Sequence, residues 1–176
     1  MTTDPFELYP VIAQIGATFA GFGSLASGLG RRRGADDARI DASRLALMLF
    51  ASLSATLLGL LPATFASLSF GEASALRISA LAALVAMLTY APFSVRRSAR
   101  IWRVGGFTMA ATAANGVCVT LSLVGFLLCA LGIGRERIAG VYLAALIGLL
   151  ASSIITFSRV IASMLRPHSR VDDSGR

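Results

Sequence analysis

The stretch that decides the fold is LALMLFASLSATLLGLLPATFASLSF, residues 45–70, which contains 26 residues and no charged side chain. A helix needs about 20 apolar residues to cross the hydrocarbon core of a bilayer. Four further stretches of comparable character occur at residues 9–29, 78–95, 107–133 and 138–165. The sequence therefore predicts an all-α protein, a polytopic transmembrane helical bundle with five spans. Residues 1–176 form a single membrane domain in this prediction, and residues 166–176 are its flexible cytoplasmic tail.

The composition of the whole chain agrees with a membrane environment. Of the 176 residues, 56% are hydrophobic and only 14% are charged. A soluble domain of this length would have to expose large apolar patches, which soluble monomers rarely do. The chain is therefore expected to lie in a lipid bilayer.

Arginines are distributed unevenly between the segments that join the predicted spans. Three of the 16 basic residues, Arg77, Arg135 and Arg137, would lie on one side of the membrane. The other thirteen would lie on the opposite side: Arg31, Arg32, Arg33, Arg39, Arg44, Arg96, Arg97, Arg100, Arg103, Arg159, Arg166, Arg170 and Arg176. Positive charge in short loops marks the cytoplasmic side. We therefore expect the N-terminus outside and the C-terminus in the cytoplasm.

The first span also has to be compared with a cleaved signal peptide. The sequence Ser24-Leu25-Ala26 is similar to a cleavage site. However, a signal peptide carries positive charge before its apolar stretch, whereas Asp4 and Glu7 occupy that position here. A retained, membrane-spanning first helix is the favoured interpretation.

Several residue types needed for enzyme chemistry are missing or misplaced. The basic residues are all arginines, which excludes the lysine of Schiff-base chemistry. The only histidine, His168, lies in the tail, and the nine acidic residues lie between or at the ends of the spans. Cys118 and Cys129 are 11 residues apart in one predicted helix, too far to form a disulfide there. We therefore expect no enzyme activity, no catalytic or metal-binding residue and no cofactor.

Small residues share one face of the first span and recur in the fifth. Small side chains every fourth residue allow helix backbones to approach closely in lipid. The residues of this predicted packing or oligomer face are Gly16, Ala20, Gly21, Ser24, Gly28, Gly140, Ala144 and Gly148. Three interpretations stay open: packing within one chain, a contact between identical chains, and the lining of a pore around an oligomer axis.

Polar residues form a stripe along the fourth span. Its members, together with two polar residues beside the small face of the first span, are Thr108, Thr112, Asn115, Ser122, Gln14 and Thr18. The amide of Asn115 needs a hydrogen-bond partner in hydrocarbon, so the stripe should face the bundle. It predicts either interhelical hydrogen bonds or the lining of a path for an ion or small solute.

Two prolines lie inside predicted spans. Pro62 and Pro92 each lack a backbone N–H and therefore leave one helix carbonyl without its usual donor. We expect a kink in the helix at each of them, as a static feature of shape or as a hinge.

Arginines near the predicted cytoplasmic surface form candidate contacts with anionic lipids such as cardiolipin. They are Arg96, Arg97, Arg100, Arg103 and Arg159. The alternative is that these charges only determine topology. Nucleic acid is not an expected partner, because the arginines are spread over three short segments.

The first part of the chain resembles a known family. The segment Ile15–Ser24, IGATFAGFGS, is followed by Arg31–Arg33, then by Asp41, Arg44 and Leu45, and finally by Leu60-Leu61-Pro62. This pattern, over about residues 10–62, resembles a family of small uncharacterised bacterial multi-pass inner-membrane proteins. The resemblance implies the bacterial cytoplasmic (inner) membrane as location and implies no activity.

These observations predict a non-enzymatic integral membrane protein that acts through helix–helix association, in a structural or accessory role. Its expected partners are the lipid bilayer, including anionic lipids, and either further copies of itself or another membrane protein. The alternative is an oligomeric ion channel or small-solute permeation pathway lined by the first and fourth spans.

Overall fold

The computed structural model describes residues 5–29, 35–102, 109–133 and 137–165 of the chain. Within these ranges, the surroundings of the side chains are described for residues 6–25, 42–92, 94–96, 110–133 and 137–162. The described residues form five α-helices and no strand. The helices are α1 (Pro5–Leu29), α2 (Ala35–Ser67), α3 (Glu72–Trp102), α4 (Met109–Leu131) and α5 (Ile138–Leu165).

All five helices are long and apolar enough to cross a membrane. The prediction of an all-α chain with five such helices is therefore confirmed. The predicted bounds match α5, but α2 begins before residue 45 and α3 extends beyond residues 78–95 at both ends. The extra turns of α2 and α3 contain charged residues. Backbone hydrogen bonding continues the helix there although the apolar stretch has ended. The predicted tail, residues 166–176, lies outside the described residues.

The ends of α2 and α4 are determined by backbone caps. After α2, Ser69 has a φ of 66° and the Phe70 N–H donates to the Phe65 carbonyl at 3.2 Å. The rings of Phe65 and Phe70 pack edge to face with centroids 5.9 Å apart. This combination is a Schellman cap with its apolar contact. It ends the helix at Ser67, before the apolar stretch ends at Phe70.

The second cap follows α4. Gly132 has a φ of 69°, and the Ile133 N–H donates to the Leu128 carbonyl at 3.1 Å. The guanidinium of Arg77, from α3, packs directly against Gly132, where a Cβ atom would collide with it. The left-handed backbone favours a glycine here, and the flexible Arg77 side chain occupies the space beside it.

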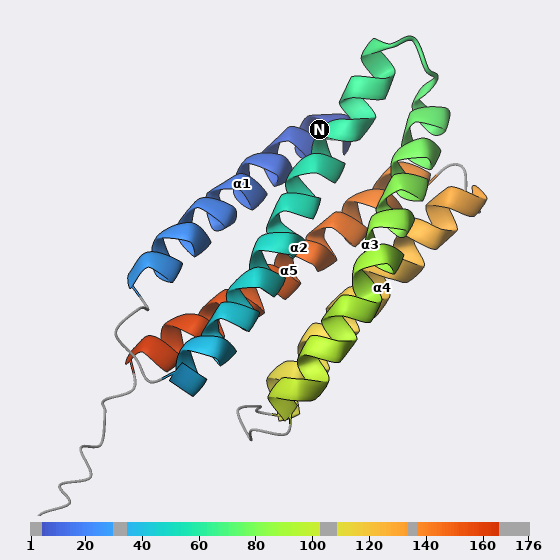
Figure 1. The fold of residues 1–176 in the computed structure, drawn as a ribbon. Coiled ribbons are helices and arrows are strands. Elements are labelled where there is room, and N and C mark those ends of the chain that lie inside the picture. Colours follow the sequence, from blue (N-terminus) through green and yellow to red (C-terminus); the bar gives the residue numbers. More distant parts are fainter. Residues whose placement is uncertain (1–4, 30–34, 103–108, 134–136, 166–176) are drawn as a thin grey trace, which may run out of the picture.

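Helices α2 and α5 lie at the centre of the bundle, as Figure 1 shows. Helix α1 packs against α2 and α5, while α3 packs against α2 and α4, and α4 also packs against α5. Helices α1 and α4 thus lie on opposite sides of the central pair and form no extensive contact in the described part of the chain (Figure 1).

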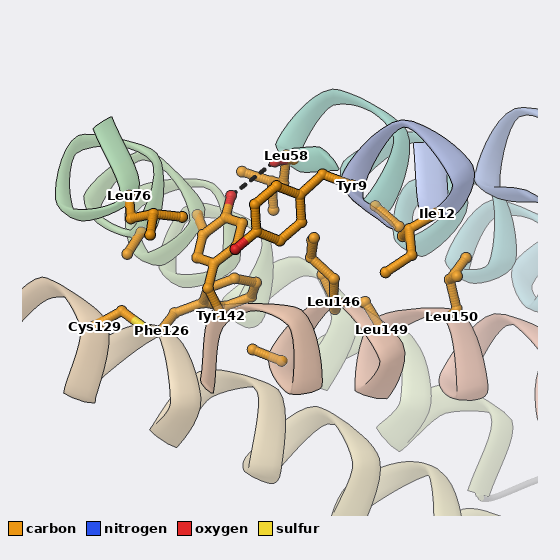
Figure 2. Close-up of a cluster of buried hydrophobic side chains, with 14 of the residues drawn as sticks. Tyr9, Ile12, Leu58, Leu76, Phe126, Cys129, Tyr142, Leu146, Leu149 and Leu150 are labelled. Carbon is orange, nitrogen blue, oxygen red and sulfur yellow. Dashed lines mark hydrogen bonds between the residues drawn. The ribbon is translucent and has the colours of Figure 1, made fainter. Parts of the chain in front are cut away.

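The largest buried cluster draws side chains from all five helices (Figure 2). Its centre is Tyr142, whose ring packs edge to face on Tyr9 and Phe126 with centroids 5.5 and 5.4 Å away. Leu58 of α2 and Leu76 of α3 belong to the same cluster. We call this end of the bundle the aromatic end.

A smaller buried cluster lies toward the other end of the bundle. It contains Leu45, Met48 and Val160, with Phe19 and Phe157 packed against it. Arg44 of α2 and Arg159 of α5 directly precede two members of this cluster, so they also lie at this end. We call it the basic end.

Candidate functional site

One part of the small-residue face of α1 packs tightly against α2. A Cβ atom on Gly16 would lie 2.6 Å from the Thr56 Oγ1 and 2.8 Å from the Ser52 carbonyl oxygen. Gly59 of α2 is equally close to α1, since a Cβ there would lie 2.9 Å from the Tyr9 carbonyl oxygen. The Thr56 hydroxyl contacts the Ala13 carbonyl at 3.2 Å. Glycines on both helices therefore permit backbone-to-backbone packing within one chain.

The other part of the same face points away from the bundle. Gly21 and Ser24 are exposed, Gly21 has no atom within 4 Å of its would-be Cβ, and Ala20 is half-buried. The Ser24 hydroxyl donates to the Gly21 carbonyl at 2.7 Å. The surroundings of Gly28 lie outside the described side-chain ranges.

The polar residues Gln14 and Thr18 also lie on the open side of α1. Both are exposed, and the Thr18 hydroxyl donates to the Gln14 backbone carbonyl at 2.8 Å. The structure shows no hydrogen bond from the Gln14 side-chain amide to another described residue. The amide thus points outward from a helix that is apolar enough to span a membrane.

Six of the exposed residues of α1 are separated by alternating steps of four and three residues. We define the α1 seam as Glu7, Val11, Gln14, Thr18, Gly21 and Leu25, all of which are exposed. This spacing is the heptad pattern by which one helix packs along another. This spacing is present in the sequence, but grouping residues by small size alone does not reveal it.

The polar stripe of α4 faces α5. The Ser152 hydroxyl donates to the Asn115 side-chain oxygen at 2.6 Å. Ser122 is buried, donates to the Cys118 carbonyl at 2.9 Å and packs directly on Gly148 of α5. Within one chain, Asn115 and Ser122 therefore make contacts between or along these two helices.

The remaining members of the predicted α4 and α5 faces are divided. Thr112 is half-buried, whereas Thr108 lies outside the described residues. Gly140 and Ala144 are exposed, so the regular repeat in α5 contacts α4 only through its later members. Helices α4 and α5 also approach each other at Gly125 and Ala145. A Cβ atom on Gly125 would lie 2.9 Å from the Ala145 Cβ.

Hydroxyl groups join α5 to α2 and α1. Ser52 and Ser153 are fully buried and lie 3.1 Å apart between their hydroxyl oxygens, and Ser153 also donates to the Met48 carbonyl at 3.3 Å. The Tyr142 hydroxyl donates to the Leu58 carbonyl at 2.7 Å, and the Tyr9 hydroxyl to the Ala139 carbonyl at 3.1 Å. Sequence reasoning missed these groups, because isolated Ser and Tyr residues in apolar helices carry no repeating pattern.

The predicted lipid-contact arginines differ in their surroundings. Arg96 is exposed on α3, whereas Arg159 is half-buried on α5 and its charge interacts with that of Arg44 on α2. Arg97 and Arg100 belong to α3, but their side chains lie outside the described ranges, as does the whole of Arg103. Arg44 was not among the predicted contacts.

No set of three or more potential metal ligands comes together in the described part of the chain. Cys118 and Cys129 are both free thiols. The contacts found here are those of helix packing and of an exposed helix face.

Comparison with protein-family models, with curated proteins and with solved structures finds no match to this chain. The resemblance of residues 10–62 to a bacterial membrane-protein family stays a prediction from the sequence.

Proposed function

We propose that this chain is a multi-pass protein of the bacterial inner membrane, with its N-terminus outside and its C-terminus in the cytoplasm. It acts without catalysis, through helix–helix association, and the α1 seam is the face that contacts a second copy. The observation that carries the proposal is the exposed Gln14 amide in the middle of an apolar helix.

The depth of Gln14 makes its exposure costly. It lies near the middle of the apolar segment Phe6–Leu25, well away from either end. An amide without a hydrogen-bond partner costs free energy in hydrocarbon, of which an interhelical hydrogen bond in a membrane recovers about 0.6–1.7 kcal/mol. A partner from outside the chain therefore lowers this cost.

A second copy of the chain supplies a suitable partner. Copies inserted in the same orientation carry parallel α1 helices, so a two-fold axis normal to the membrane brings equivalent residues together. An amide both donates and accepts, so two Gln14 side chains are mutually complementary. Gly21, one heptad farther along, has no side chain to separate the helices. Glu7 lies at the end of the seam, where the headgroup region solvates it.

The alternative function is an ion channel or a pathway for a small solute. The exposed polar groups of the α1 seam favour α1 as the helix that lines this pathway. Several copies arranged around an axis would direct Glu7, Gln14 and Thr18 toward one route. The stripe of α4 faces α5 within each chain, so Asn115 contributes less to such a route than the sequence suggested.

The test is the association state of full-length protein in liposomes, followed by single-molecule photobleaching as the protein is diluted in lipid. Gly21→Leu should weaken association at least about tenfold, because a branched side chain prevents close approach. Gln14→Leu should weaken it about 3-fold to 20-fold, since interhelical hydrogen bonds in membranes contribute about 0.6–1.7 kcal/mol.

The matched control is Gly116→Leu. Gly116 is an exposed glycine of α4 with no atom within 4 Å of its would-be Cβ. It should leave association unchanged. A monomer at every dilution, or equal effects of Gly21→Leu and Gly116→Leu, contradicts the proposal. Larger oligomers whose ion conductance is altered by Gln14→Leu would establish the channel instead.

A further inference from the structure

The contacts between α2 and α5 define an antiparallel register. Toward the aromatic end, Leu58 contacts Tyr142, and farther along, Met48 and Ser52 contact Ser153. Residue numbers thus rise along α2 as they fall along α5. Continuing this register toward the basic end brings residues 40–45 of α2 opposite residues near 160 of α5.

The buried cluster at the basic end agrees with this register. Leu45 of α2 and Val160 of α5 belong to the same cluster, and both are buried. Arg44 and Arg159 each directly precede one of these residues. The two arginines therefore lie at the same level of the α2–α5 pair, near enough for their charges to interact.

The two guanidinium groups are partly enclosed by the protein. Both side chains are half-buried, and the Arg44 Nε is shielded from solvent. Two like charges repel, and the repulsion grows when protein replaces part of the surrounding water. An anion between the two groups attracts both of them and so offsets this repulsion, in addition to the contacts that each arginine makes within the protein.

We propose that Arg44 and Arg159 together hold the phosphate group of an anion at the basic end of the bundle. Each guanidinium is a planar fork with about five N–H donors, a shape that binds phosphate oxygens in pairs. A protein partner for either fork leaves further donors for the phosphate.

The position of the pair along the helices fits a phosphate at membrane-surface depth. Arg44 lies at the start of the apolar segment Ala42–Ser67, and Arg159 lies near the end of the segment Ile138–Ala162. Long arginine side chains at such positions reach the headgroup level. The phosphate can belong to a phospholipid or be free in solution. This site does not depend on the α1 seam, which lies on another helix.

The experiment uses full-length protein in phosphatidylcholine nanodiscs that contain increasing fractions of phosphatidylglycerol. After transfer to a mild detergent at about 0.3 M salt, which screens diffuse attraction, bound phosphatidylglycerol is counted by native mass spectrometry. A second arm adds inorganic phosphate to pure phosphatidylcholine nanodiscs and follows its binding by phosphorus NMR. Retention in the first arm identifies a lipid as the source, and binding in the second identifies free phosphate.

Arg44→Gln or Arg159→Gln should reduce binding at least about tenfold, because each removes charge-assisted hydrogen bonds. The matched control is Arg137→Gln, which removes an exposed arginine outside the predicted lipid contacts and should leave binding unchanged. Arg44→Lys and Arg159→Lys keep the charge but lose the fork, so they should bind at an intermediate level. These lysine variants carry the test if a glutamine variant fails to fold.

Absence of binding in both arms overturns the proposal. It is equally overturned if Arg137→Gln reduces binding as much as Arg44→Gln, or if the lysine variants bind as tightly as the wild type. Either result would mean that general positive charge, and not a two-arginine site, attracts the anion.

Discussion

The hydroxyl group of Tyr142 donates a 2.7 Å hydrogen bond to the carbonyl of Leu58. Leu58 lies four residues before Pro62, which has no backbone N–H, so this carbonyl lacks its normal helix donor. Both side chains are buried, at 5% and 0% exposure for Leu58 and Tyr142. A tyrosine of α5 therefore supplies the donor that the proline of α2 withholds, and the bond ties the two central helices together.

Tyr142→Phe should lower the free energy of unfolding by about 1–3 kcal/mol, because a buried carbonyl is left without a partner. Unfolding by SDS in mixed micelles measures the change. The control is the same substitution in a Pro62→Ala background, where a backbone N–H again reaches the Leu58 carbonyl. There the cost of Tyr142→Phe should be clearly smaller. Equal costs in both backgrounds would show that the hydroxyl does not replace the missing N–H.

Gly16 and Gly21 should respond differently to the same substitution, although they lie on one small-residue face. Gly16→Ala should lower the free energy of unfolding by about 1–3 kcal/mol, because the added methyl group meets Thr56 and the Ser52 carbonyl. Gly21→Ala should leave it unchanged or raise it by up to about 1 kcal/mol, through helix propensity. The comparison is made with monomeric protein in detergent. Equal losses at both positions would contradict the observed packing of α1.

The bond between Ser152 and Asn115 can be measured by a double-mutant cycle. Asn115→Leu and Ser152→Ala, singly and together, should show a coupling of about 0.6–1.7 kcal/mol in unfolding free energy. Thr120→Ala, at an exposed site on α4, is the control and should not couple to Ser152→Ala. A coupling of zero for the first pair would mean that the stripe does not join α4 to α5.

Ser69→Gly should stabilise the protein by about 0.5–1 kcal/mol. Ser69 has a φ of 66°, a conformation that costs a residue with a Cβ about 1–2 kcal/mol. Glycine avoids this strain but loses more backbone entropy on folding, so the net gain is smaller. Thermal unfolding in detergent detects the gain as a higher midpoint. Ser74→Gly, in the first turn of α3, is the control and should not stabilise. A lower midpoint for Ser69→Gly would contradict the cap described after α2.

The five helices could be predicted because their length and apolar character are local properties. A segment such as residues 138–165 is recognisable without knowing what surrounds it, and its bounds agree with α5. Helix ends were less predictable where a backbone cap decides them. Ser69 looks like an ordinary serine in the sequence, and its left-handed conformation comes from the turn that joins α2 to α3.

Helical periodicity shows which residues share a face, but it does not show which neighbour covers that face. The spacing places the small residues of α1 on one face, yet Gly16 packs against Thr56 while no described atom lies within 4 Å of a Cβ built on Gly21. The reason is geometric: the small-residue arc is wider than one helix contact, so α2 covers only part of it. The pairing of Arg44 with Arg159 has the same origin, since residues so distant in sequence become neighbours only when α2 and α5 pack antiparallel. Segment length and composition are properties of the chain, whereas the partner of each face depends on how the five helices pack together.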